Sequence, residues 1–580
     1  LSNTTGADNT ANGYMALRAN TTGTQNTALG DRALRYNTTA SDNTAVGYYA
    51  LLDNTTGAHL VAVGSGALEN NTTGNYNVAV GKMTLRTNTT GASNVGAGYE
   101  TLYLNTTGSN NVAFGRASMY TNTTGGNNVA VGHDSLKANT TASNNTAVGF
   151  SALTANTTGT SNTAVGYNAL NDNTTGADNT VLGYGALSAS ITSSNNTAVG
   201  SLALLSSTTG AFNTATGWEA LRNNISGDFN TATGIQALKN TTTGSNNTAT
   251  GRGSLESNTT GQDNTASGYY SMVSNTTGHY NTAMGREALR NNVSGQYNSA
   301  FGQNALFNNT ATSNTAVGSH ALFANTTAGS NTAIGYNSLG ANTTGYENTA
   351  VGTGALQTNT TAYRNTAVGF QALKASTTGS GSNTCIGYRS GRYISTGQDN
   401  VFVGMNTGGY QQPISTGNGN ILIGPYTDTI TAGSNYAHGL GYNLNCAAGY
   451  TTLGLGNNDI RHSHGNATWS TVSDERYKKD ITTSTAGLSF INDLTPRTWN
   501  YKTLGELPET FNAYEEDSTE VFKNTQTNHG FIAQEVKAVI DSHSEIKDGF
   551  RLWDDREDGS QEVAEAALIP VLVKALQELS

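Results

Sequence analysis

A strict 17-residue repeat constrains this chain more than any other feature of its sequence. Glycines recur at this spacing from Gly13 to Gly302 without a slip, which gives eighteen glycines in phase. Four more follow from Gly318 after a one-residue deletion, and two more, beginning at Gly387, follow after a one-residue insertion. Self-similarity at a short fixed period is typical of solenoids, in which each unit packs only on its neighbours.

Each unit reads approximately N-T-A-V-G-Y-x-A-L-x-x-N-T-T-G-x-x, which predicts two short strands and two turns. The glycine forms the corner of the coil, and N-T-T-G carries turn residues that tolerate left-handed backbone angles. Four residues after the glycine the side chain is always apolar, which predicts a stacked core. The first members of this column are Leu17, Leu34, Leu51, Leu68, Leu85, Leu102, Met119 and Leu136.

An asparagine stands four residues before the glycine in almost every coil, with Leu60 as an exception. Examples are Asn9, Asn26, Asn43, Asn77, Asn94 and Asn111. Stacked amides can bond from coil to coil, so we interpret this column as a structural ladder and not as a binding site. The first 412 residues contain no proline, which suits unbroken ladders of backbone hydrogen bonds.

A coil with three or four apolar side chains encloses a thin core that a lone solenoid could hardly stabilise against chain entropy. Packing three solenoids around one axis would bury a further face of each coil. The sequence therefore predicts a mainly β fold, a homotrimeric parallel β-solenoid shaft. About 22 coils at ~4.8 Å between strands give a shaft on the order of 100 Å long.

Composition and charge narrow the function classes. Of the net charge of -11, residues 473–580 contribute -10, from 21 acidic and 11 basic groups. A near-neutral body with an acidic end has no electrostatic footprint for nucleic acid or for an anionic membrane surface. Cys385 and Cys446 match no metal or redox spacing, so buried free thiols are expected. We expect no cofactor and no membrane span, since no apolar run approaches the length that a span needs.

Two recurrent features of the shaft each have a structural and a functional interpretation. N-T-T satisfies the N-glycosylation pattern, at Asn3, Asn20, Asn37, Asn54 and onward, but it follows automatically from a repeated turn. Aromatic residues recur after the corner glycine, at Tyr14, Tyr48, Tyr99, Phe150, Tyr167 and Trp218 among others. Such a row can stack on sugars, but it also packs on cross-strand neighbours, and we favour the structural interpretation of both features. No recurring carboxylate pair supports a depolymerase activity.

The unit Asn43-Thr44-Ala45-Val46-Gly47 resembles the N-x-V-A-I-G repeats of trimeric autotransporter adhesin heads, and residues 1–406 share this resemblance. It implies a left-handed parallel β-roll. Residues 407–472 lose the strict repeat and are expected to form an irregular neck or tip, the leading region for receptor contact. His462 and His464 lie there at i and i+2. Three chains could gather six imidazoles around a metal, although exposed histidines are the simpler interpretation.

Composition changes abruptly at Ser473, where S-D-E-R-Y-K-K-D-I begins. This segment, followed by L-T-P at residues 494–496 and H-G-F-I-A-Q-E-V at 529–536, resembles the peptidase S74 intramolecular chaperone domain over residues 473–580. The resemblance implies a Ser-Lys dyad of Ser473 and Lys478, with Lys479 as the alternative base, and cleavage at Val472-Ser473. A base makes the weak serine nucleophile reactive, and a partly buried lysine with a lowered pKa can serve. The alternative is an ordinary solvated helix start.

The apolar pattern of residues 566–579 predicts a helix that bundles about the threefold axis, so the C-terminal domain is expected to be a small α+β chaperone. Together these features predict an extracellular homotrimeric fibre of a virion tail that recognises a host-surface receptor, such as a glycan. A bacterial cell-surface trimeric adhesin is the alternative. The chain begins with Leu1 inside a repeat, so we expect an N-terminal part that carries a baseplate-docking domain, an export signal or an anchor.

Overall fold

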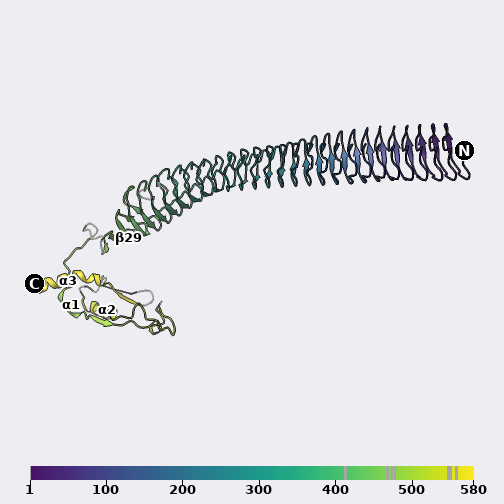
Figure 1. The fold of residues 1–580 in the computed structure, drawn as a ribbon. Helices are drawn as coiled ribbons and strands as arrows, with labels where there is room; N and C mark the ends of the chain where they lie inside the picture. The colour runs from purple at the N-terminus through teal and green to yellow at the C-terminus, as the bar shows by residue number, and fades with distance from the viewer. Residues whose placement is uncertain are drawn as a thin grey trace. The chain divides into compact units, whose positions relative to one another are not determined.

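A computed structural model places most of the chain. It describes residues 2–379, 381–409, 414–456, 458–465, 469–471, 475, 478–511, 513–544, 546, 552–555 and 560–580. The chain divides into two compact units, residues 1–471 and 472–580. The first unit is a stack of coils that runs from the purple N-terminus to strand β29 (Figure 1).

Each coil of the first unit contributes one strand of three residues. These strands are β1 (Thr10–Asn12), β2 (Thr27–Leu29), β3 (Thr44–Val46), β4 (Val61–Val63), β5 (Val78–Val80), β6 (Val95–Ala97), β7 (Val112–Phe114), β8 (Val129–Val131), β9 (Thr146–Val148), β10 (Thr163–Val165), β11 (Thr180–Leu182), β12 (Thr197–Val199), β13 (Thr214–Thr216), β14 (Thr231–Thr233), β15 (Thr248–Thr250), β16 (Thr265–Ser267), β17 (Thr282–Met284), β18 (Ser299–Phe301), β19 (Thr315–Val317), β20 (Thr332–Ile334), β21 (Thr349–Val351), β22 (Thr366–Val368), β23 (Thr384–Ile386), β24 (Val401–Val403) and β25 (Ile421–Ile423).

Neighbouring strands pair in parallel, and each residue faces its equivalent in the next coil. Thr44 faces Val61, for example, and Ala45 faces Ala62. The register is preserved through the one-residue deletion, where Ser299 faces Thr315. The shaft is therefore a parallel β-solenoid of 17-residue coils, as the repeat predicts.

The coil contains one strand where the sequence pattern suggests two. The segment with the core leucine is a turn, and the leucine itself has a left-handed backbone, with φ of 52° at Leu51. Its N–H still donates to the next coil, at 3.0 Å from the carbonyl oxygen of Ala67. The left-handed residues thus lie at this leucine, at the residue two before it, such as Tyr49, and at the residue before the ladder asparagine, such as Asp42. The N-T-T turn, where the sequence suggested them, has none.

The core of the shaft is a narrow column of small and medium side chains. From β2 to β25 the middle residue of each strand, usually alanine, is buried, and so is the leucine four residues after the corner glycine. Ala147 and Leu153 are fully buried in one such coil. The predicted leucine column is therefore confirmed as core.

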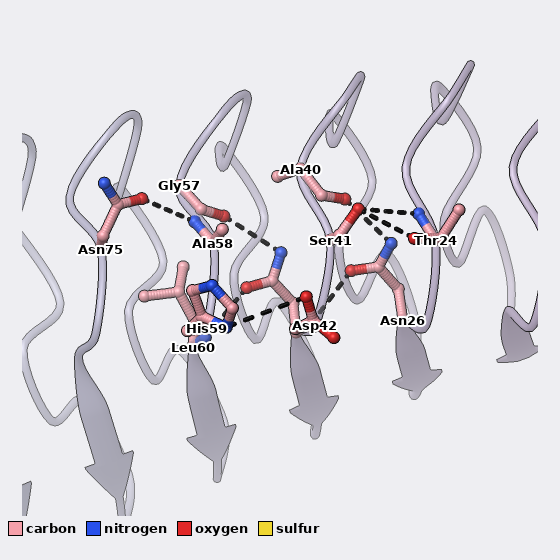
Figure 2. Close-up of polar contacts among 11 residues, drawn as sticks. Thr24, Asn26, Ala40, Ser41, Asp42, Gly57, Ala58, His59, Leu60 and Asn75 are labelled. Carbon is pink, nitrogen blue, oxygen red and sulfur yellow. Dashed lines mark hydrogen bonds and ion pairs between the residues drawn. The ribbon is translucent and has the colours of Figure 1, made fainter.

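The asparagine column before the strand forms a polar ladder between coils, interrupted by the side chain of Leu60 (Figure 2). The side-chain amide of Asn26 donates to the carbonyl oxygen of Ala40 at 2.9 Å, and that of Asn43 donates to Gly57 at 3.0 Å. The Asn43 N–H donates in turn to Asn26 Oδ1 at 3.1 Å. Leu60 keeps its place in the column because its N–H donates to Asn43 Oδ1 at 3.0 Å. The structural interpretation of this column is confirmed.

The parallel sheet continues beyond residue 406, within the stretch where the sequence repeat fades. Strand β27 (His438–Tyr442) pairs with β25 in parallel, and β29 (Tyr450–Leu455) pairs with β27. The short strands β26 (Asp428–Thr429) and β28 (Asn445–Cys446) form a second parallel pair. Antiparallel strands then end the sheet, with β30 (Asn458–Ser463) against β29 and β31 (Trp469–Thr471) against β30.

Both cysteines are buried free thiols, as expected. Cys385 occupies the alanine position of strand β23, and Cys446 lies in β28. Burial raises the pKa of the Cys385 thiol far above its usual range and that of Cys446 to about 12. Because the thiolate is the reactive form, both groups are inert in the folded shaft.

The second unit is a small α+β domain. Its elements are α1 (Leu488–Asp493), β32 (Arg497–Trp499), η2 (Leu504–Glu506), β33 (Asn528–Gly530), α2 (Ala533–Ser542), β34 (Trp553–Asp555), β35 (Gln561–Val563), η3 (Glu565–Ala567) and α3 (Leu568–Leu579). Strands β32 and β33 form one antiparallel two-stranded sheet, and β34 and β35 form another. The three helices share one hydrophobic core, so the predicted C-terminal helix is present.

Candidate functional site

The chain just after L-T-P meets the start of H-G-F-I-A-Q-E-V in space. Residues 497–499 of strand β32 pair with residues 528–530 of strand β33. The guanidinium of Arg497 donates two hydrogen bonds to the carboxylate of Glu535, each 2.9 Å long. These bonds lower the pKa of Glu535, and a two-pronged contact of this kind fixes orientation as well as distance. This contact holds helix α2 against the two-stranded sheet of β32 and β33.

A hydrophobic core supports this arrangement. Phe490 of α1 is fully buried, and Val536 and Ile540 of α2 pack in the same cluster with Val571 of α3. The imidazole of His543, at the end of α2, lies 2.9 Å from the carboxylate of Asp493, at the end of α1. The second unit thus has its own core, which packs helices on one another.

The proposed dyad falls at the start of this unit. Val472 and Ser473 lie outside the described residues, whereas Lys478 and Lys479 are described and exposed. The Lys478 N–H donates to the carbonyl oxygen of Glu475 at 2.9 Å. Both candidate bases therefore stand on an exposed segment ahead of helix α1, and the distance from either to the serine hydroxyl stays untested.

The histidine pair near the end of the shaft gains a partner that sequence spacing did not suggest. Strand register places His438, Thr451 and His462 side by side on three successive strands. The rings of His438 and His464 lie 4.7 Å apart between centroids, and His464 Nε2 is 3.2 Å from the Thr451 hydroxyl. Within the part of the chain that the structure describes, no three His, Cys, Asp or Glu side chains are close enough to hold a metal.

This histidine contact predicts a pH dependence of the shaft end. Burial, with a smaller contribution from the positive charge of His464, lowers the pKa of His438. The unfolded chain then binds a proton more readily than the folded one, so stability falls as the pH drops below about 6.5. We expect the protection of β27 to β30 amides, measured as exchange relative to the intrinsic rate at each pH, to fall between pH 7 and pH 5, and the His438→Gln variant to lose this dependence. The matched control His59→Gln should keep it, and equal pH dependence in both variants would contradict the assignment.

The aromatic row of the shaft is a stack of rings. His133, Phe150, Tyr167 and Tyr184 follow one another on successive coils, with centroids 5.2 to 5.4 Å apart and planes within 18° of parallel. The faces of the interior rings therefore cover one another and leave their edges outward. Stacking on a sugar needs an exposed ring face, so the structural interpretation holds for this run.

The N-T-T asparagines form a second buried ladder. The side-chain amide of Asn54 donates to Asn37 Oδ1 and to the Gly57 carbonyl, both at 2.9 Å, and Asn37 repeats the bond to Asn20. These three asparagines are fully buried, whereas Asn3 in the first coil is exposed. The nitrogen that a glycan would occupy is thus used in the fold from Asn20 onward in these coils, which supports the structural interpretation.

Across the described ranges, the helices are all too short or too polar to cross a membrane.

Comparison with known proteins identifies one part of the chain. Residues 473–544 match the Peptidase S74 family model, which is described as chaperone of endosialidase. No curated protein matches the chain significantly. The matched segment contains the Ser473 and Lys478 motif and both strands of the two-stranded sheet formed by β32 and β33. Behind its β-solenoid shaft of 17-residue coils the chain thus carries a C-terminal chaperone-of-endosialidase segment, a combination that fits a tail fibre with a chaperone domain.

Proposed function

We propose that the chain is the subunit of a homotrimeric extracellular fibre, the tail fibre of a phage or phage-like particle, that binds a host-surface receptor. The observation that carries this proposal is the chaperone-of-endosialidase segment that follows the β-solenoid in the sequence. Residues 1–406 form the shaft in this proposal, residues 407–472 the neck that contacts the receptor, and residues 473–580 the chaperone. A bacterial surface adhesin with the same chaperone is the second candidate, because the shaft repeats fit both.

The chaperone in this proposal removes itself by one peptide cleavage. The Ser473 hydroxyl attacks the carbonyl carbon of Val472, with Lys478 as the base that takes the hydroxyl proton. The acyl group moves from the Ser473 nitrogen to its oxygen and the amine is freed. Water then hydrolyses the ester and leaves residues 1–472 with a new carboxyl end.

The exposure of both lysines supports a link between cleavage and assembly. A base must be neutral to take the serine proton, and burial disfavours the charged form of a lysine side chain. Lys478 and Lys479 are exposed in the single chain. In the proposed mechanism, burial between subunits activates the base, so cleavage follows trimer formation.

Repetition of the shaft explains why a chaperone is useful. A slip of one whole coil between subunits preserves nearly all contacts of a 17-residue repeat, so the shaft alone specifies its register weakly. A non-repetitive domain that associates first aligns the three chains before the shaft closes. Its removal then leaves a fibre that is kinetically trapped in the correct register.

Electron microscopy with a gold-labelled antibody against the shaft tests the proposed location. The tail-fibre proposal predicts label on the tails of free particles from the producing culture. Label confined to the surface of intact cells would overturn it in favour of the adhesin.

A further inference from the structure

One face of the shaft, formed by the first and third residues of each strand from β1 to β25, has no charged residue. We call it the strand face. Its 50 positions contain no Asp, Glu, Lys, Arg or His. From β2 onward the middle residue of each strand points the other way, into the core, as the alternation of a strand requires.

The shaft does contain charged residues, but they lie on its other sides. Glu219, for example, follows the corner glycine after β13 and binds Arg222 at 2.7 Å and Lys239 at 2.8 Å. None of the ion pairs found among the described shaft residues includes a residue of β1 to β25. Charge is therefore kept off the strand face, as it is off the N-T-T turn, and the strand face differs from that turn in its apolar third position.

The third position of the strand face is an exposed apolar column. Its members that are more than a third exposed are Leu29, Val63, Val80, Phe114, Leu182, Met284, Phe301, Val317, Ile334, Ile386 and Ile423. Four successive coils, β13 to β16, carry threonine or serine there instead, and they too are uncharged. The first position is mostly threonine or valine.

The uncharged strand face has a larger area than a protein surface of this kind normally exposes to water. With about 4.8 Å between strands and about 3.3 Å per residue, 25 strands of three residues span about 120 Å by 10 Å, or about 1,200 Å². A typical stable interface covers about 800 Å² on each partner. An uncharged sheet face of this extent is expected to be covered by another molecule.

We propose that the strand face is the inner surface of the fibre, where each chain packs against the strand faces of two further copies of itself. This inference rests on the proposed trimer, and it names the surface through which the three chains contact one another. A partner must be flat, uncharged and periodic at the spacing of the strands along the full shaft. A parallel copy in register meets all three requirements, because its own strand face has the same columns at the same rise.

Cysteine cross-linking tests this assignment directly. Thr163→Cys and Val165→Cys place a thiol in each column of the strand face at β10, and Thr175→Cys places one in the exposed N-T-T turn of the same coil. The native thiols are buried, so they do not compete. On oxidation of the native fibre, at least one strand-face variant should run as a covalent dimer on a denaturing gel, while Thr175→Cys should stay monomeric.

The outcomes separate this inference from the proposed function. A wild type that is monomeric by native mass spectrometry overturns both. A trimeric wild type whose strand-face variants remain unlinked, or whose Thr175→Cys variant links equally well, overturns only the assignment of the face.

A charge variant gives an independent measurement. Lysines at Val131, Val165 and Val199 should reduce the trimer fraction at least tenfold. The matched control carries lysines at the exposed Thr141, Thr175 and Thr209 of the same three coils and should assemble like wild type. Equal assembly of the two variants would contradict the proposal.

Discussion

The Ser473→Ala variant should remain a full-length chain of 580 residues under conditions in which the wild type separates into residues 1–472 and 473–580. Alanine lacks the hydroxyl that attacks the Val472 carbonyl in the proposed mechanism, so the rate should fall by about a thousandfold or more. Mass measurement under denaturing conditions after timed incubation gives both the rate and the cleavage position. Lys478→Met should slow cleavage comparably, because the hydroxyl then lacks its base.

Two controls make this result specific. Ser484→Ala changes an exposed serine in the same unit and should leave cleavage unchanged. Lys479→Met tests the alternative base, and loss of cleavage in this variant alone would transfer the role from Lys478 to Lys479. Cleavage of Ser473→Ala at the wild-type rate would refute the serine mechanism.

The Gly149→Ala variant should disrupt the shaft locally, with a loss of about 3 kcal/mol or more in the stability of the coils around it. Gly149 has φ of 138°, which a residue with a side chain rarely adopts, and an added Cβ would lie 2.3 Å from the carbonyl oxygen of Gly166 in the next coil. Because each coil packs only on its neighbours, the damage should appear as new protease cleavage near residue 149 and a lower unfolding temperature.

The same substitution in the turn is the matched control. An added Cβ at Gly159 would also lie close to the next coil, 2.2 Å from the carbonyl oxygen of Gly176, but Gly159 does not have the left-handed φ of Gly149. Ala142 occupies the equivalent position one coil earlier, so the stack accommodates a Cβ there and Gly159→Ala should be tolerated. A Gly149→Ala variant as resistant to protease and heat as Gly159→Ala would show that the corner does not need glycine.

The sequence was sufficient to predict the stacked core and the asparagine ladder, since both follow from columns that recur at one spacing. It did not predict that Leu51 and its equivalents sit in a left-handed turn. The residue types A-L give no turn signal, and the conformation is stabilised by bonds between coils, such as that from the Leu51 N–H to Ala67. The turn propensity of a residue describes its own coil alone, whereas these hydrogen bonds form only between two stacked coils.

The candidate site residues likewise divide into those that the sequence could predict and those that depend on contacts between strands. Ser473 and Lys478 could be proposed from the sequence, because both lie within one short motif, S-D-E-R-Y-K-K-D-I, that resembles the chaperone family. The contact between His438 and His464 could not, since it depends on the shortened last coil, in which His438 pairs with Thr451. The Arg497–Glu535 contact likewise depends on the pairing of two strands about thirty residues apart.

The central claim is that residues 473–580 assemble the shaft and are then dispensable. It is tested most directly by making residues 1–472 in two ways, by cleavage of the full chain and by expression of the truncated chain alone. Native mass spectrometry of both products should show a trimer from the cleaved chain and no comparable trimer from the truncated one, since only the first was aligned before release. The same trimer in the same yield from both would contradict the account.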